Sequence, residues 1–128
     1  MKRDMELVRK ILFAIEEQYV DRIIYNLDIE GHTMAEIAYH CKILHEAGLV
    51  SDYGSKNADD HIYIFAVSSL TWDGCDYLDK VRQDTVWNKT KDVITKQGLP
   101  MILDVVKDVS TAVITSMTEG AVKAILGK

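Results

Sequence analysis

This chain of 128 residues is short of proline, cysteine and long apolar runs. One proline and seven glycines argue against a disordered or low-complexity chain. No stretch approaches the roughly 18 apolar residues expected of a membrane span, and charged residues rather than an apolar signal core follow Met1. Cys41 and Cys75 lack the CxxC spacing of redox and metal motifs. We therefore expect a reduced, cytoplasmic protein.

The chain also lacks an excess of positive charge. Its net charge is −5, and no long segment is strongly basic. Phosphate contacts carry much of the affinity of a DNA-binding protein, so the overall charge counts against nucleic acid, although a local basic patch would still be compatible with it. The length suits one domain with an appendage, and 48% hydrophobic residues are enough for a core without disulfides or metal.

Hydrophobic periodicity predicts a first helix over residues 5–18, with Asp4 as its N-cap. Its predicted apolar stripe is Met5, Val8, Ile11, Leu12 and Ile15. β-Forming residues predict a short strand within 22–29. Thr33 followed by Glu36 is a capping box, which predicts a helix over 34–47 that ends at Gly48. The apolar stripe of this helix is formed by Ile37, Cys41 and Leu44, and it is closed by Leu49.

Two strands, 49–53 and 61–68, are predicted to form a hairpin with the turn-rich segment 54–60 at its tip. Thr71 is the predicted N-cap of one long helix over 72–97, in which Trp72 and Trp87 would share a buried face. Pro100 opens a last amphipathic helix over about 100–126, whose wide apolar surface needs a partner.

This order of elements predicts an α+β, mostly helical fold: a winged-helix-like domain over 1–98, followed by an added long C-terminal helix over 99–128 for oligomerisation or core packing. One usual part is missing. A helix-turn-helix has a supporting helix before its recognition helix, and only strand-like sequence precedes Thr33.

Catalytic and metal-binding patterns are weak. His40, Cys41 and His45 lie close together in sequence, but only Cys41 and His45 have the i, i+4 spacing that places two ligands on one helix face. Two ligands do not make a structural zinc site. Neither cysteine lies in a nucleophile motif, and the sequence has no phosphate-binding glycine loop. We therefore expect no enzyme activity, catalytic residue, metal, cofactor or small-molecule ligand.

Two functions remain open. If the 34–47 helix reads double-stranded DNA, the candidate contacts are Thr33, Tyr39 and Lys42, with Lys56 reaching the backbone from the wing. The protein would then be a DNA-binding transcriptional regulator of bacterial or phage origin. Acidic residues surround these positions, so the alternative is a protein-interaction or structural module that does not bind DNA. In both cases residues 100–128 are predicted to form a homo-oligomer.

Several segments resemble a bacterial and phage family, domain of unknown function 2513. They are the opening twelve residues, Tyr39-His40-x-x-x-Leu44-x-x-Ala47-Gly48-Leu49, Leu70-Thr71-Trp72-x-Gly74, Leu78-Asp79, and Arg82-x-Asp84-Thr85-Val86-Trp87-x-Lys89-x-Lys91. The resemblance covers about residues 1–98 and implies a winged-helix-like fold with no established activity. A histidine commonly follows the glycine of Leu-Thr-Trp-x-Gly in this family, whereas this chain has Cys75 there.

Overall fold

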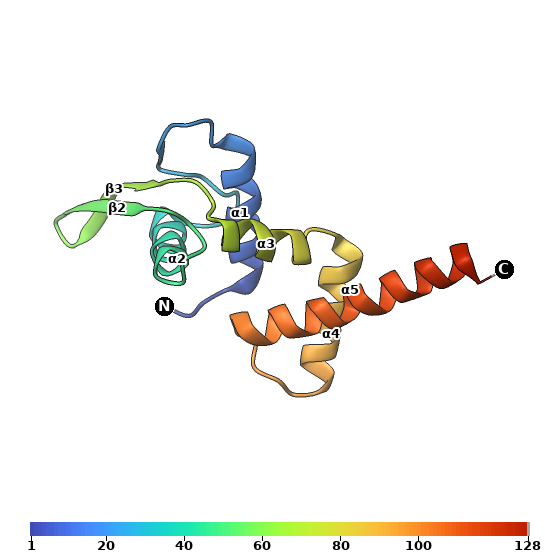
Figure 1. Ribbon diagram of the computed structural model, residues 1–128. Helices are drawn as coiled ribbons and strands as arrows, with labels where there is room; N and C mark the ends of the chain where they lie inside the picture. The colour runs from blue at the N-terminus through green and yellow to red at the C-terminus, as the bar shows by residue number, and fades with distance from the viewer. Residues whose placement is uncertain (128) are drawn as a thin grey trace. The chain divides into compact units, whose positions relative to one another are not determined.

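A computed structural model describes residues 1–127, which form an α+β, mostly helical protein (Figure 1). The chain divides into two compact units, one over Met1–Leu78 and one that begins at Asp79. The division lies within a helix, and each unit is described separately below. The domain boundary predicted at residue 98 stays a prediction.

The first unit contains α1 (Met5–Gln18), β1 (Ile24–Tyr25), α2 (Met34–Glu46), β2 (Tyr53–Ala58), β3 (His61–Val67) and most of α3 (Trp72–Val81). The strands form one antiparallel sheet in the order β1-β3-β2. Figure 1 shows α2 along one side of the β2–β3 hairpin, and α2 contacts both of these strands. A helix, a strand, a helix and a hairpin follow one another as expected for a winged-helix-like domain, and no helix lies between β1 and α2.

The predicted N-caps of α1 and α2 and the glycine that ends α2 are confirmed. The Asp4 carboxylate accepts hydrogen bonds from the N–H groups of Glu6 and Leu7, which caps α1. Thr33 and Glu36 form the predicted capping box at the start of α2. Gly48, with φ +77°, ends α2 in the left-handed conformation that favours glycine. The predicted apolar stripes of both helices are buried: Met5, Val8, Ile11, Leu12, Ile15, Ile37, Cys41, Leu44 and Leu49.

The hairpin extends further than predicted, because residues 54–58 belong to β2 rather than to a loop. Asp59 and Asp60 alone form the turn, with φ of 50° and 68°. Positive φ at both central residues is the backbone of a type I′ turn, whose twist matches the flanking strands. The predicted strand at 49–53 is correspondingly wrong: only Tyr53 belongs to β2, and Val50 makes a single bridge to Leu70.

The predicted strand over 22–29 is limited to two residues by Asn26. This residue has φ 49°, and its N–H donates to the carbonyl of Phe65 at 2.9 Å. Its side-chain Oδ1 accepts the Phe65 N–H, also at 2.9 Å. The side-chain carbonyl of Asn26 thus takes the place of its own backbone carbonyl as the acceptor for Phe65, so β1 ends at Tyr25.

The predicted helix over 72–97 is two helices, α3 and α4 (Asp84–Lys96), separated at Arg82 and Gln83. Val81 and Val86 are both buried. Five residues apart on one helix, they would point about 140° away from each other. The interruption lets both be buried, and it removes the shared face predicted for Trp72 and Trp87. Trp87 is buried, whereas Trp72 is 81% exposed.

The second unit pairs α4 with α5 (Leu103–Leu126), which begins three residues later than predicted. Only Val106 and Ser110 of α5 are buried, and every described side chain from Thr115 onward is exposed. Figure 1 shows the second half of α5 extending past α4. The wide apolar face predicted for this helix is therefore largely exposed, with Met117, Val122, Ile125 and Leu126 all on the surface.

Candidate functional site

The four residues predicted to contact DNA come from α2 and the wing. Thr33 is already engaged, since its Oγ1 accepts the Glu36 N–H at 3.2 Å and donates to Glu36 Oε1 at 3.1 Å. Tyr39 is half-buried, and its ring meets the ring of His40 edge-on at 5.5 Å between centroids. Lys42 and Lys56 are exposed. Thr33 and Lys42 are nine residues apart, or about 13 Å along a helix axis.

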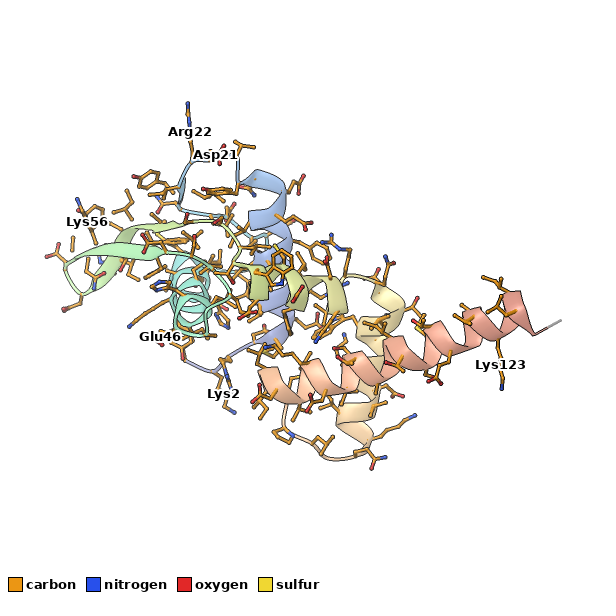
Figure 2. All side chains as sticks on the ribbon, viewed as in Figure 1. Lys2, Asp21, Arg22, Glu46, Lys56 and Lys123 are labelled. Atoms are coloured by element: carbon orange, nitrogen blue, oxygen red, sulfur yellow. The ribbon has the colours of Figure 1, made fainter. Side chains whose placement is uncertain are left out.

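The charges around these residues are mainly negative. Glu46 lies one turn after Lys42 on the exposed side of α2, and Asp59 and Asp60 form the tip of the wing near Lys56. Figure 2 shows Glu46 on α2 and Lys56 on the hairpin. Hydrogen bonds from the Thr33 backbone and from His32 hold the pKa of Glu36 below its usual range, which keeps that carboxylate charged. The acidic residues of α2 and of the hairpin thus outnumber the lysines that these elements carry.

The whole first unit is more acidic than the chain average. Residues 1–78 hold seven Lys and Arg residues against fourteen Asp and Glu residues, so this unit carries more negative charge than the net −5 of the chain. The second unit is slightly basic. A net negative charge of this size opposes the approach of a phosphate backbone, most strongly at low salt.

The two sequence motifs that suggested a winged helix meet in space. Thr71 donates its N–H to the Leu49 carbonyl at 3.0 Å and its hydroxyl to the Gly48 carbonyl at 2.5 Å. The same hydroxyl accepts the Gly74 N–H at 3.0 Å, so one side chain joins the end of α2 to the start of α3. A Cβ at Gly74 would overlap the Leu49 carbonyl oxygen. These motifs therefore hold the scaffold together.

His40, considered from sequence only as a weak metal ligand, has a structural role. It is 2% exposed, and its Nε2 lies 2.9 Å from the Asp4 backbone nitrogen, which donates to it. Its Nδ1 lies 2.7 Å from the Glu36 carbonyl oxygen and donates to that oxygen. Both ring nitrogens are engaged, and the imidazole links the start of α1 to α2. Within residues 1–127, no group of three or more His, Cys, Asp or Glu residues is placed to hold a metal ion.

The two cysteines lie in different environments. Cys41 is fully buried, and burial raises the pKa of its thiol to about 12, so it is an unreactive core residue, as predicted. Cys75 is exposed on α3. Burial likewise raises the pKa of Tyr77, whose hydroxyl has no hydrogen-bond partner among the described residues. None of these three residues lines the hollows described on residues 1–127.

One surface feature was missed from sequence: a hollow on the outer face of the sheet, turned away from α2. Its volume is about 130 Å³, and it is lined by Ile23, Asp52, Gly54, Ala66 and Ser68 with the neighbouring Tyr53 and Val67. The signal was present, because Ala66 of β3 and Ser68, just after its end, alternate with the buried Phe65 and Val67. Their small size became meaningful only once the strand register placed Gly54 beside Ala66.

Comparison with known proteins identifies the family of this chain. A family described as "Hypothetical protein (DUF2513)" matches residues 2–100. The chain belongs to this family. An uncharacterised protein of Haemophilus influenzae is 38% identical over 120 residues, covering 91% of this chain and 98% of that protein. No solved structure matches. The predicted resemblance is confirmed, and it brings no known activity with it.

None of the described helices is both long and apolar enough to cross a membrane.

Proposed function

We propose that this member of the DUF2513 family is a non-enzymatic protein-interaction module that uses a winged-helix-like scaffold. The observation that carries the proposal is the twofold excess of acidic over basic residues in the first unit, which includes both α2 and the wing. Such a surface attracts a protein with a basic patch and repels a nucleic-acid backbone.

A DNA-binding regulator is the second candidate. The order of elements favours it, because α2 directly precedes the hairpin as a recognition helix precedes a wing. Lys42 and Lys56 are its exposed cationic contacts, and double-stranded DNA would be the partner. The acidic neighbours of both lysines count against it.

A duplex-binding assay separates the two candidates. The purified chain is titrated at micromolar concentration into labelled random duplex DNA at low salt, and fluorescence anisotropy is measured. The interaction module should leave the anisotropy unchanged. Saturable binding that weakens with salt and with Lys42→Ala or Lys56→Ala would establish the regulator instead. Glu17→Ala, an exposed charge change on α1, is the matched control.

Affinity capture from native-host lysate then tests the interaction module directly. The chain should retain a protein in stoichiometric amount, and retention should fall as salt is raised, because the attraction is between opposite charges. Nuclease treatment of the lysate should leave that retention unchanged. Recovery of protein that disappears with nuclease treatment would indicate bridging by nucleic acid and overturn the proposal.

A further inference from the structure

The hollow on the outer sheet face is produced by three small residues in neighbouring positions, Gly54, Ala66 and Ser68. β3 is the central strand, and its register places Tyr25 of β1 and Gly54 of β2 on either side of Ala66. Ser68 donates its N–H to the Asp52 carbonyl at 3.1 Å, which continues the pairing by one further row. Residues paired across strands share a face, so Gly54, Ala66 and Ser68 form a shallow floor.

The walls of this hollow differ in chemistry. On the β1 side the wall is Ile23, which is 49% exposed. Tyr25, which is 64% exposed, does not line the hollow but lies next to it as the strand partner of Ala66. On the β2 side is the carboxylate of Asp52, of which only Oδ1 is engaged in a described bond, accepting the Tyr53 N–H at 2.8 Å. Nothing lies within 4 Å of a Cβ built on Gly54, so the floor is open there. An apolar wall at Ile23 and an anionic one at Asp52, with the Tyr25 strand position next to them, suit a long cationic side chain.

We propose that this hollow binds an arginine or lysine side chain of a partner protein. The aliphatic stem would cover Ala66 and Gly54 as such stems cover apolar surface elsewhere. The charged head would reach Asp52 in a charge-assisted hydrogen bond, and Tyr25 would add a cation–π contact. Asp52 at the hollow provides the local charge complementarity, and the acidic excess of the unit as a whole favours approach of a basic segment. The inference rests on the proposed interaction function and names the surface that serves it.

The test is an NMR titration of the full chain with three blocked tripeptides, Ala-Arg-Ala, Ala-Lys-Ala and the neutral Ala-Gln-Ala. The arginine and lysine peptides should shift the amide signals of Gly54, Ala66 and Ser68 saturably, with a dissociation constant of about millimolar for so small a contact. The glutamine peptide should leave them unchanged. Asp52→Asn should weaken the arginine peptide about fivefold, as expected for one exposed charge pair.

Two variants make the result specific. Gly54→Val fills the hollow with a residue that suits a strand, and it should abolish the shifts while the remaining spectrum stays folded. Asp28→Asn removes an exposed carboxylate that does not line the hollow, and it should leave the affinity unchanged. Peptide-induced shifts that persist in Gly54→Val would overturn the proposal, and so would a loss of affinity in Asp28→Asn equal to that in Asp52→Asn, because both would indicate general charge attraction. A parent spectrum that the arginine and lysine peptides leave unchanged would also overturn it. Capture of a protein partner that survives Gly54→Val would leave the interaction function intact and remove only this surface.

Discussion

Substitution of Gly74 by alanine tests whether the two family motifs form a structural junction. In an exposed helix the change from glycine to alanine stabilises by about 0.5–1 kcal/mol, because glycine loses more backbone freedom on folding. Gly74 is a buried residue of α3, and the added Cβ would overlap the Leu49 carbonyl oxygen. Backbone opposes this methyl group, so the clash cannot be relieved by turning a flexible side chain.

The magnitude follows from the contacts at this junction. Overpacking a tight site costs about 1–3 kcal/mol. If the end of α2 and the start of α3 separate to relieve it, the two bonds from Thr71 to Leu49 and Gly48 are also weakened, at about 1 kcal/mol each. After the gain in helix propensity is subtracted, we expect Gly74→Ala to lose about 2 kcal/mol of unfolding free energy.

Urea unfolding followed by circular dichroism measures this change. For a urea dependence of about 1–3 kcal/mol per molar, a loss of about 2 kcal/mol lowers the midpoint by roughly 1 M. Gly54→Ala is the control within the same unit, since its Cβ meets nothing within 4 Å, and it should stay within about 0.5 kcal/mol of the parent chain. A Gly74→Ala protein as stable as the parent, or more stable, would refute the close approach of α3 to Leu49.

Further predictions concern the buried groups and the wing. Ellman's reagent should label Cys75 rapidly and Cys41 only on unfolding. The pKa of Cys41 is raised from 9.0 to about 12, so the buried neutral thiol contributes to stability below pH 9, and this contribution is lost as the pH rises toward 12. The unfolding free energy from urea titrations should fall by about 1.4 kcal/mol between pH 8 and 10, and Cys41→Ala should lack this loss. The same pH dependence of the unfolding free energy in both proteins would contradict the prediction. His40→Ala should cost about 2–4 kcal/mol in the same assay through two lost hydrogen bonds and a cavity, and a neutral result would contradict the link to Asp4. Asp60→Gly should stabilise by about 1 kcal/mol, because glycine adopts positive φ without strain, and a lower melting temperature would exclude the type I′ turn.

Local signals predicted most of the first unit. Asp4, the capping box of Thr33 and Glu36, and Gly48 each act within one turn of the backbone, so the sequence alone places them. The apolar stripe of α1 is regular over about three turns and that of α2 over about two. A regular stripe shows which side of the helix is buried. These features required no knowledge of which elements meet.

Non-local contacts account for the elements that were wrong. Asn26 ends β1 by bonding Phe65, which is 39 residues away. The break between α3 and α4 allows both Val81 and Val86 to be buried. Hydrophobic periodicity does not detect so short an interruption. Two aspartates form the hairpin turn where Asn-Gly or Asp-Gly is usual, so the turn-rich composition of 54–60 concealed a strand.

The candidate site was harder to predict, because the sequence shows its residue types but not their positions in space. A lysine on a helix before a hairpin predicts DNA contact by analogy with the scaffold, yet the same scaffold serves many functions. Charge is the basis of our proposal that this scaffold serves protein interaction. Lys42 is followed one turn later by Glu46, and the wing that carries Lys56 ends in two aspartates. A phosphate backbone reaching either lysine would lie close to a carboxylate as well.

The junction at Thr71 explains why the recognisable motifs do not reveal a ligand. Gly48, Leu49, Thr71 and Gly74 use their backbone groups, one hydroxyl and one missing side chain to hold α2 against α3. The groups paired within this junction are not available to a partner. Our proposal therefore places recognition at positions that the fold leaves open. Among the residues described in the first unit, the hollow beside Tyr25 combines an unfilled floor, an apolar wall and an anionic wall, and a protein surface with one projecting basic side chain satisfies all three.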